Sequence, residues 1–360
     1  MIRVNNIHLS LDYDDKSVRK AVAQQLRIEE KSIKSCKIFR RSVDARKKDN
    51  IYFLTTVDAE LNINEEKVCK KCGNAQIARK YEYNQMKFGN APSPIVVGAG
   101  PAGLFAALIL ARSGANPILI ERGRDVDRRT ADVNRFWTSG KLDITSNVQF
   151  GEGGAGTFSD GKLNSGTKDI RQRKVLEEFV SHGAPDEILY NAKPHIGTDM
   201  LKGTIKNIRN EIIELGGRVM FETKLVSMAF SDNKLKSITV ETANGDEIIE
   251  TDNVILAIGH SARDTFEMLY DLKLPIEAKP FSVGARIEHL RQKVDKAQYG
   301  RFAGNKKLGS ANYKLSTHLD NGRGVYTFCM CPGGKVVNAS SEKNRLCTNG
   351  MSEFARNADN

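Results

Sequence analysis

The chain has 360 residues, of which 40% are hydrophobic and 28% are charged, and its formal net charge is +11 at pH 7. This is the composition of a globular protein with room for two or three domains. The sequence has no apolar stretch as long as a membrane span, and its first residues lack the pattern of a signal peptide. We therefore expect a cytoplasmic protein without membrane contact.

Residues 1–88 predict a small basic α+β domain. Alternating side chains predict a strand at 2–11, and Val18, Val22 and Leu26 recur every four residues, as on one face of a helix. Further strands are predicted at 33–38 and 51–61. A polar segment with two prolines, residues 80–94, predicts a linker.

Most of the excess of basic over acidic residues lies in the first 90 residues of the chain. Residues 1–90 contain 19 Lys and Arg but only 12 Asp and Glu, with basic clusters at 40–41, 46–48 and 70–71. Nucleic-acid contact is one interpretation of these clusters. A solvated basic surface is the other, and it is favoured because the clusters lack the interleaved aromatic residues of a base-stacking surface.

The most specific motif is a glycine-rich turn, IVVGAGPAG at residues 95–103. Gly98 permits the tight turn out of a strand, and Gly100 lets backbone N–H groups approach a pyrophosphate. Gly103 lets the following helix pack closely on the strand. Because that helix would begin with unpaired N–H groups facing the anion, the turn predicts a dinucleotide-binding site.

The sequence around the turn supports this prediction. Leu104, Leu108 and Ala111 recur at helical spacing after it. The next apolar run, at residues 117–120, predicts a buried strand that ends in Glu121, whose carboxylate can accept from a ribose hydroxyl. Together these elements predict the first half of a doubly wound α/β domain.

The rest of this domain is predicted further along the chain. Four elements are expected in order: a helix at 198–215, a strand at 218–221, a β-meander at 225–250 and a buried parallel strand at 254–259. Asn244 and Gly245 form a suitable two-residue hairpin turn inside the meander. The strand predicted at 254–259 would then lie beside the strand that precedes the glycine turn.

Longer runs of sequence carry a family resemblance. They are NVQFGEGGAGTFSDGKL at 147–163, PHIGTD at 194–199, SVGARIEH at 282–289, and CPGG at 331–334 through NGM at 349–351. With the glycine turn and Glu121-Arg122, they make residues 94–360 resemble the bacterial family of uncharacterised FAD-dependent dehydrogenases. That family belongs to the two-dinucleotide-binding-domain flavoproteins with a glutathione-reductase-like fold. The segment in front resembles the small domain that these proteins carry before it.

The resemblance implies three parts: a small basic α+β domain at 1–88, an FAD-binding domain at 89–275 and a partial substrate or cap domain at 276–360. The implied fold is α/β, a doubly wound FAD-binding Rossmann-like domain with a β-meander. In the family, a further C-terminal stretch with another glycine motif completes the flavin domain. We therefore expect this sequence to lack its C-terminal part, which leaves open whether these residues hold FAD by themselves.

The resemblance also implies the cofactor, FAD, and the residues that would hold it. The pyrophosphate would lie against Gly98, Ala99, Gly100, Pro101, Ala102 and Gly103. Glu121 would bind the adenosine ribose, and Arg122 would lie along the adenosine or a phosphate, or else be a surface cation. Val226 would contact adenine through its backbone or be a core valine, and Gly259 would let FAD pass closely.

A second glycine-rich segment, residues 151–161, has five glycines in eleven positions. Glycine lets backbone approach a ligand closely, so we expect this segment to follow the pyrophosphate or flavin side of the site. Lys162 could compensate negative charge on a reduced flavin. The candidate contacts are Gly153, Gly154, Ala155, Gly156, Thr157, Ser159, Gly161 and Lys162. A flexible surface loop is the alternative.

The sequence assigns no catalytic residue. His195, His260 and His289 lie nearest to the motifs and are candidate acids or bases, but a structural role is favoured for each of them. Arg286 could bind a substrate carboxylate, or it could pair with an acid such as Glu288.

The cysteines predict no metal site. Cys69 and Cys72 form a single C-x-x-C pair, whereas a structural zinc needs four ligands. Two ordinary thiols are favoured there over zinc or a redox dithiol. Cys329 and Cys331 would point their thiols to opposite faces if they lie in a strand, which argues against a shared metal.

The sequence therefore predicts an FAD-dependent oxidoreductase that moves a hydride between flavin and an unknown small-molecule substrate, with NAD(P)H as a transient partner. Two alternatives stay open. One is an RNA-associated flavoprotein that docks through residues 1–88. The other is a truncated fragment that binds nucleotide without turnover.

Overall fold

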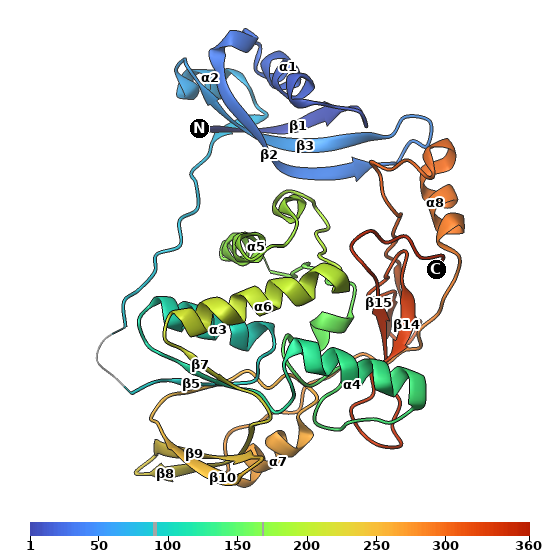
Figure 1. The fold of residues 1–360 in the computed structure, drawn as a ribbon. Helices are drawn as coiled ribbons and strands as arrows, with labels where there is room; N and C mark the ends of the chain where they lie inside the picture. The colour runs from blue at the N-terminus through green and yellow to red at the C-terminus, as the bar shows by residue number, and fades with distance from the viewer. Residues whose placement is uncertain (89–91, 168) are drawn as a thin grey trace.

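The computed structural model describes residues 1–88, 92–167 and 169–360. An antiparallel sheet lies at one end of the molecule and a parallel sheet lies near the other, and an extended segment joins them along one side (Figure 1). Within the predicted linker, residues 89–91 lie outside the described part. The linker residues that are described, 80–88 and 92–94, contain no helix or strand.

Three strands of the N-terminal sheet form where the sequence predicts strands, whereas the fourth strand, at 75–77, and the helix at 65–71 were not predicted. The strands are all antiparallel, in the order β2-β3-β1-β4. The elements are β1 (Ile2–Leu9), α1 (Asp15–Leu26), β2 (Ile33–Asp44), β3 (Tyr52–Leu61), α2 (Glu65–Lys71) and β4 (Ala75–Ile77). Helix α1 begins where the Asp14 carboxylate accepts from the Ser17 N–H at 2.8 Å. Its buried face contains Val18, Val22 and Leu26, which confirms the predicted helical stripe.

A segment from late in the chain completes the core of this sheet. Helix α8 (Arg291–Tyr299) and the residues after it bring Tyr299, Leu308 and Ala311 into the same buried cluster as β1 and β3. Arg301 also donates to the backbone oxygen of Asp49 at 2.7 Å. The region predicted as one domain, 276–360, is therefore shared, because part of it packs on the N-terminal sheet.

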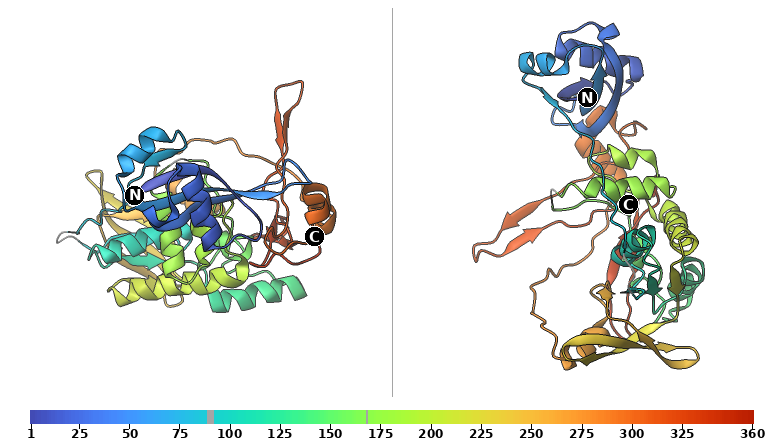
Figure 2. Two further views of the ribbon diagram at one scale, coloured as in Figure 1. Left: turned by 90° about the horizontal axis from the view of Figure 1, so that it is seen from above. Right: turned by 90° about the vertical axis from the view of Figure 1, so that its left-hand side faces the viewer.

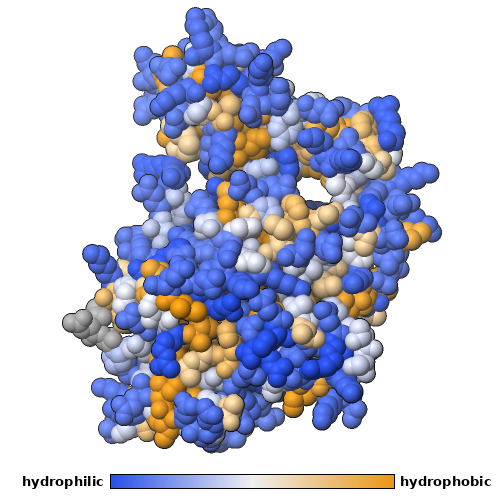
Figure 3. All heavy atoms as spheres, viewed as in Figure 1, coloured by the Kyte–Doolittle hydropathy of each residue, from blue (hydrophilic) through white to orange (hydrophobic). Residues whose placement is uncertain are grey.

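Two arginines of the predicted basic clusters are bound within the protein. Arg41 donates to Asn191 Oδ1 at 2.8 and 3.1 Å, which ties β2 to the second of the predicted domains. Arg46 donates to the carboxylate of Asp44. Hydrophilic side chains still cover most of the N-terminal sheet and its helices on the face shown in Figure 3. Docking of RNA on this surface stays a prediction.

The second sheet is parallel, in the order β11-β5-β6-β7. It consists of β5 (Ile95–Val97), β6 (Ile118–Ile120), β7 (Arg218–Met220) and β11 (Val254–Leu256), and helices α3 (Pro101–Arg112) and α6 (Thr198–Glu214) lie on one face. Val96 and Leu119 are buried with these helices, whereas Ile95, Val97 and Ile120 are buried on the opposite face. The alternation of side chains along each strand thus builds a three-layer domain.

The layer on the opposite face is the predicted β-meander. It consists of β8 (Lys224–Ser231), β9 (Lys234–Thr242) and β10 (Gly245–Glu250). The predicted turn at Asn244 and Gly245 is wrong by one residue, because Gly245 pairs with Thr242 and the connection is Ala243-Asn244. Gly245 has a φ of +105° and is already the first residue of β10.

The prediction that residues 254–259 form a buried strand is only partly right. β11 pairs in parallel with β5, as expected. It is the outermost strand of the described sheet, however, and Ile255 and Leu256 are 40% and 39% exposed. An apolar run cannot distinguish a central strand from an edge strand, because position in the sheet is a tertiary property.

The remaining elements lie around the two sheets, with η1 and η4 beside the N-terminal sheet. They are η1 (Glu30–Ser32), α4 (Val126–Ser139), η2 (Gly154–Phe158), α5 (Gln172–Ser181), η3 (Asp186–Leu189), α7 (Arg263–Asp271), η4 (Gly300–Phe302), β12 (Ser316–His318), β13 (Gly324–Tyr326), β14 (Lys335–Asn338) and β15 (Thr348–Met351). The β12–β13 hairpin projects away from the rest of the molecule (Figure 2). Within the described ranges, no helix combines the length and the apolar character that crossing a membrane requires.

Helix α6 provides a direct test of the layer packing. Ile208 is 1% exposed in the layer between α3 and α6, whereas Ile213 on the same helix is 49% exposed. We expect Ile208→Ala to lower the free energy of unfolding by about 2–5 kcal/mol, because it leaves a cavity in the core. Ile213→Ala should cost less than about 1 kcal/mol. Urea unfolding of both variants measures this difference, and equal losses would contradict the observed burial.

Candidate cofactor site

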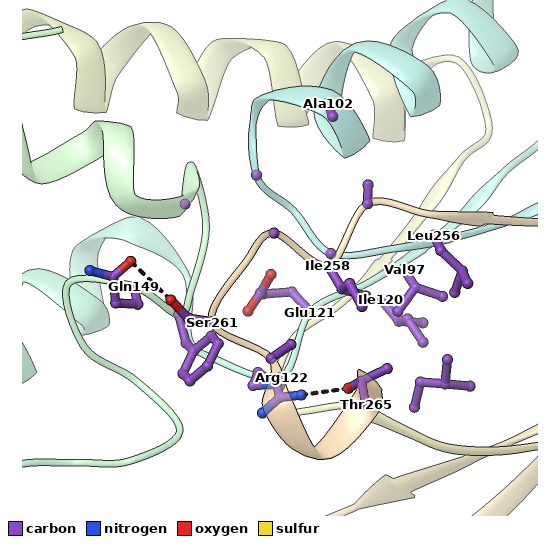
Figure 4. A pocket seen from close by; sticks show the side chains of 18 of the residues that line it. Val97, Ala102, Ile120, Glu121, Arg122, Gln149, Leu256, Ile258, Ser261 and Thr265 are labelled. Atoms are coloured by element: carbon purple, nitrogen blue, oxygen red, sulfur yellow. Dashed lines mark hydrogen bonds between the residues drawn. The ribbon is translucent and has the colours of Figure 1, made fainter. Parts of the chain in front are cut away.

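A cavity of about 490 Å³ lies where strands β5, β6 and β11 end. Figure 4 shows it with the glycine turn and the start of α3 on one side and the start of α7 on another. Its walls are formed by Val97, Gly98, Gly100, Pro101, Ala102, Ile120, Glu121, Arg122, Gln149, Phe150, Gly151, Gly154, Ala155, Thr223, Lys224, Leu225, Leu256, Ala257, Ile258, Gly259, His260, Ser261, Ala262, Thr265, Phe266 and Leu269. This is the place where ligands bind in open α/β sheets, outside the carboxyl ends of parallel strands.

The glycine turn needs glycine at two of its positions. Gly98 has a φ of +102°, and a Cβ there would lie 2.5 Å from the backbone oxygen of Ala257. A Cβ at Gly103 would lie 1.8 Å from the backbone oxygen of Gly98. A side chain at Gly98 would clash with the backbone after β11, and a side chain at Gly103 would push α3 away from the glycine turn. The close packing predicted for these two glycines therefore matches the structure.

The N-terminus of α3 is free to bind an anion. Gly100 is its N-cap residue and makes no side-chain cap, and Pro101 takes the first helical position. Gly100, Pro101 and Ala102 all line the cavity. Unpaired N–H groups and the helix dipole favour a phosphate at such an end. Ala99 does not line the cavity, and its N–H donates to the carboxylate of Glu121.

Glu121 occupies the position expected of a ribose-binding acid. Its carboxylate is buried and lines the cavity at the end of β6. The two oxygens accept from the N–H groups of Ala99 at 2.8 Å, Gly123 at 2.9 Å and Gly151 at 3.0 Å. An ionised carboxylate has about four lone-pair positions, so about one acceptor position remains for a ribose hydroxyl.

Arg122 lines the cavity but is held by α7. Its guanidinium donates to Asp264 at 2.9 and 3.2 Å and to Thr265 Oγ1 at 2.9 Å, and it stacks on Phe150 (Figure 4). Burial opposes ionisation of Asp264, but hydrogen bonds from Arg122 and Lys224 lower its pKa well below the ordinary value. In this structure Arg122 therefore joins β6 to α7 and forms a wall, rather than standing as a surface cation.

The first part of the second glycine-rich segment packs directly on the glycine turn. The N–H of Gly153 donates to the oxygen of Ala99 at 2.8 Å. A Cβ on Gly154 would lie 3.2 Å from Gly100 Cα, so the two backbones touch. Gly154 and Ala155 line the cavity beside the helix N-terminus. The prediction that this segment follows the pyrophosphate therefore agrees with the geometry at these two residues.

The second part of that segment leaves the cavity wall, so the cofactor contacts predicted for five of its residues stay predictions. These residues are Gly156, Thr157, Ser159, Gly161 and Lys162, none of which lines the cavity. Thr157 is buried against α6, where its backbone oxygen accepts from Thr198. The chain changes direction within η2. A glycine-rich sequence does not predict where such a change occurs.

Lys162 meets a different partner from the one expected. Its ammonium pairs with Asp160 at 2.7 Å and lies 3.6 Å from Cys331 Sγ. Asp160 is 1% exposed and also accepts from Arg356 and Ser352. Burial opposes ionisation of Asp160, but the hydrogen bond and charge of Arg356 and the charge of Lys162 lower its pKa.

The sequence did not single out Arg129, which organises the cavity wall. This side chain of α4 is fully buried and donates to the backbone oxygens of Asn147, Val148, Gly151, Glu152 and Gly154, at 2.5–3.3 Å. Burial lowers the pKa of Arg129 to about 10, and the charges of Glu121 and Glu152 oppose that shift. One signal was available: Arg129 falls on the same helical face as Val126 and Val133, both of which are buried.

Of the two remaining predicted contacts, one lines the cavity and the other does not. Gly259 lines it, with a φ of +68°, after the end of β11. Val226 does not line it, although the residues just before it in the chain, 223–225, do. Val226 sits at an irregularity in the β8–β9 register, between Leu225 and Ser227. Its backbone contact with adenine stays a prediction.

The candidate acids and bases are dispersed. His260 lines the cavity, with Nδ1 3.0 Å from Ser261 Oγ. His195 stacks on Phe354, and burial together with the charge of Arg356 lowers its pKa. His289 lies 2.8 Å from the hydroxyl of Tyr313.

Arg286 does not form the ion pair with Glu288 that was one of its two alternatives, whereas Cys69 and Cys72 lie where ordinary thiols are expected. Arg286 donates to the backbone oxygen of Cys329 at 2.8 Å, whereas Glu288 accepts from the N–H of Val336. No ion pair joins Arg286 to Glu288 in the described residues. Cys69 and Cys72 both pack at the edge of the N-terminal core, as ordinary thiols do.

The fold and the cavity define a nucleotide-binding α/β protein, and comparisons with known proteins identify its family. Residues 93–132 match the FAD binding domain, and residues 280–360 match the FAD-dependent protein, C-terminal domain-like family. Residues 1–60 match a domain of unknown function. An uncharacterized protein of Clostridium beijerinckii is 47% identical over 365 residues, which cover 100% of this chain and 68% of that protein. The chain belongs to the same family as that protein, a family of FAD-dependent proteins, and FAD is its cofactor.

Solved structures with low sequence identity are similar over about half of this chain. THI4 of Thermovibrio ammonificans is 16% identical with a TM-score of 0.32, and the match covers 51% of this chain and 64% of that one. A Bacillus halodurans glycerol-3-phosphate dehydrogenase complexed with FAD is 14% identical with a TM-score of 0.33, over 50% of this chain and 36% of that one. The chain thus spans less than two thirds of the length of these structures.

Arg129→Met tests whether one guanidinium holds the cavity wall. We expect the free energy of unfolding to fall by at least about 3 kcal/mol, because several buried carbonyls lose a partner and each costs about 1–3 kcal/mol. FAD affinity should fall with it. Arg135→Met on the same helix is the control, since the Arg135 side chain is half exposed and surface ion pairs contribute about 0–1 kcal/mol. Urea unfolding and FAD titration measure both effects, and equal losses in the two variants would argue against the role of Arg129.

Asp160 predicts a defined dependence of stability on pH. Because its pKa in the folded protein lies below the ordinary aspartate value of 3.8, its stabilising contribution is present above that value and is lost as pH falls through the lower folded pKa. At neutral pH, Asp160→Asn should lower the free energy of unfolding by about 3–5 kcal/mol, since it breaks a buried ion pair. The difference between wild type and variant should shrink as the solution is acidified below the ordinary aspartate pKa.

The exposed Asp271 offers the matched control for this experiment. Unfolding curves of wild type, Asp160→Asn and Asp271→Asn at several pH values give the comparison. A loss that stays constant down to strongly acidic pH would show that Asp160 is not ionised in the folded protein.

Proposed function

We propose that this protein is an FAD-dependent oxidoreductase that exchanges a hydride between FAD and a small organic substrate, with NAD(P)H as a transient second partner. The observation that carries the proposal is the pairing of an uncapped helix N-terminus with a buried carboxylate in one cavity. Within the FAD-dependent proteins, the glycine turn and the β-meander favour the glutathione-reductase-like group.

The residues present fit the pyrophosphate and ribose of FAD. Gly100 and Ala102 would present backbone N–H groups and a favourable helix dipole to the pyrophosphate. Gly154 would let the backbone of the second glycine-rich segment approach from the other side. Glu121 keeps about one acceptor position free for a ribose hydroxyl. The site therefore combines the donors and the acceptor that this part of FAD requires.

When bound, FAD supplies the two-electron chemistry, and the protein binds and orients it. Phe150 and the methylene part of Arg122 would exclude water from one side of the cavity, and Arg122 is kept in place by Asp264. Gly259 would allow a close approach where β11 ends. These roles are binding and positioning roles, and none of them requires a protein acid or base.

A visible absorbance spectrum of the purified chain, followed by identification of any released chromophore, tests cofactor retention. A yellow protein that releases FAD would support the proposal, and bleaching by a chemical reductant would show that the bound FAD can accept electrons. Screening of NAD(P)H and organic donors under anaerobic conditions then tests the reaction. FAD that stays oxidised with every donor would argue against oxidoreductase function.

Glu121→Gln tests the ribose contact. The amide offers one oxygen to three backbone N–H donors and to the ribose, so we expect the Kd for FAD to rise about 10- to 100-fold, because a hydrogen bond to a charged group contributes about 1.5–3 kcal/mol. Glu222→Gln is the control, since its half-exposed carboxylate pairs with Arg124 and Arg128 outside the cavity wall. Titration of the apoprotein with FAD measures both values. An unchanged Kd in Glu121→Gln would remove Glu121 from the proposed site.

A further inference from the structure

Cys329 and Cys331 lie together in an irregular segment rather than in a strand. Residues 327–331 have no regular secondary structure, and Cys329 has a φ of +57°. This left-handed residue interrupts the alternation of side chains that a strand would impose. The expectation that the two thiols face opposite sides was conditional on a strand, and that condition is not met. Cys331 Sγ donates instead to the backbone oxygen of Cys329 at 3.4 Å.

Two cations lie against this pair. Lys162 Nζ is 3.6 Å from Cys331 Sγ, and Arg286 Nη1 donates to the backbone oxygen of Cys329 at 2.8 Å. Asp160 holds Lys162 in place at 2.7 Å. The absence of a side chain at Gly350 makes this packing feasible, since a Cβ there would lie 2.6 Å from Cys331 Sγ and 3.1 Å from Arg286 Nη1. Residues from three distant parts of the sequence thus converge on one pair of thiols.

The surroundings shift the pKa values of the two thiols in opposite directions. The neighbouring Cys331 thiol, opposed by burial and assisted by the charges of Lys162 and Arg286, lowers the pKa of Cys329 to about 5. The neighbouring Cys329 and burial raise the pKa of Cys331. Asp160 and Lys162 are the other charged groups that act on Cys331. A low-pKa thiol beside a protonated one is the arrangement used for thiol–disulfide exchange.

We propose that Cys329 and Cys331 form a redox-active dithiol that reduces small anionic disulfides, with Cys329 as the attacking thiolate and Cys331 as the resolving thiol. Both thiols are partly buried, unlike the exposed Cys347, so a small disulfide reaches them more readily than a cystine in a folded protein. Lys162 and Arg286 favour a disulfide with negative charge. The proposal does not depend on the FAD-dependent activity.

The exchange balances without any other reactant. The Cys329 thiolate attacks one sulfur of R–S–S–R, the S–S bond breaks, and one thiolate RS⁻ leaves with its bonding electron pair. A mixed disulfide remains on Cys329. Cys331 gives its proton to the released thiolate and attacks the Cys329 sulfur, which expels the second RS⁻. The substrate gains two electrons, and the dithiol loses two electrons and the one proton of Cys331, which leaves on the first RSH. The second RS⁻ takes its proton from water as the Cys329–Cys331 disulfide forms.

The test uses the whole chain, oxidised glutathione as the probe and mass spectrometry of peptides. Wild type should form the Cys329–Cys331 disulfide and release two equivalents of reduced glutathione. Cys331→Ser should accumulate a mixed disulfide on Cys329, because the resolving thiol is missing. Cys329→Ser should do neither, and Cys347→Ser should behave as wild type. Glutathionylation confined to Cys347, or a wild type that keeps both thiols free, would overturn the proposal.

Alkylation of wild type by iodoacetamide gives a measurement that needs no variant. The rate at Cys329 should be nearly constant above about pH 6, because the thiolate is the reactive form and its pKa is about 5. A typical thiol, with a pKa of about 8.5, still reacts faster with each step from pH 7 to 9. A rate at Cys329 that follows this ordinary profile would contradict the assignment of Cys329 as the attacking thiolate.

Comparison of an anionic with a cationic disulfide tests the role of the charges. We expect oxidised glutathione to react faster than cystamine, by about tenfold or more, since local charge steers encounter. Lys162→Met should reduce this ratio, whereas Lys141→Met, an exposed lysine elsewhere, should not. A ratio below one in wild type would exclude an anionic substrate. The visible spectrum of the FAD-loaded protein should be unchanged in Cys329→Ser, which keeps a failure here distinct from a failure to bind FAD.

Discussion

The cavity wall depends on one buried guanidinium. Arg129 has no exposed surface, and its N–H groups donate to five backbone oxygens between residues 147 and 154. A polar segment that bends so sharply has few backbone partners of its own, and unpaired buried carbonyls are costly. A rigid planar donor with five N–H groups meets this need at once. The charges of Glu121 and Glu152 offset part of the cost of burying Arg129.

Glu121 links this segment to the glycine turn. Its carboxylate accepts from Ala99 in the turn and from Gly151 in the second glycine-rich segment. The two segments also touch through backbone alone, at Gly100 and Gly154. Hydrogen bonds within the protein therefore hold the two glycine-rich segments in place, so the shape of the site does not depend on a bound ligand. Preorganisation of this kind reduces the ordering that binding would otherwise require.

Features that depend on residues close together in the sequence were predicted, whereas features that depend on distant residues were not. The glycine turn was predicted because each glycine answers a local steric need within a few residues. The helix at 198–215 was predicted because the recurrence of apolar residues along a helix is a local pattern. In contrast, the exposure of Ile255 and the direction taken after Ala155 depend on neighbours far along the chain. Lys162 illustrates the same limit, since its partner Cys331 is 169 residues away.

The sequence by itself determined the class of the protein. The spacing of glycines and an acid after a strand specifies a dinucleotide site, because only that backbone geometry needs those residues in that order. Only the tertiary structure decided which side chains meet. It placed Arg129 under the cavity wall, paired Arg122 with α7, and brought Cys329 and Cys331 beside Lys162. The physical reason is that charge and hydrogen-bond partners act across a few ångströms of space, whatever their separation in the sequence.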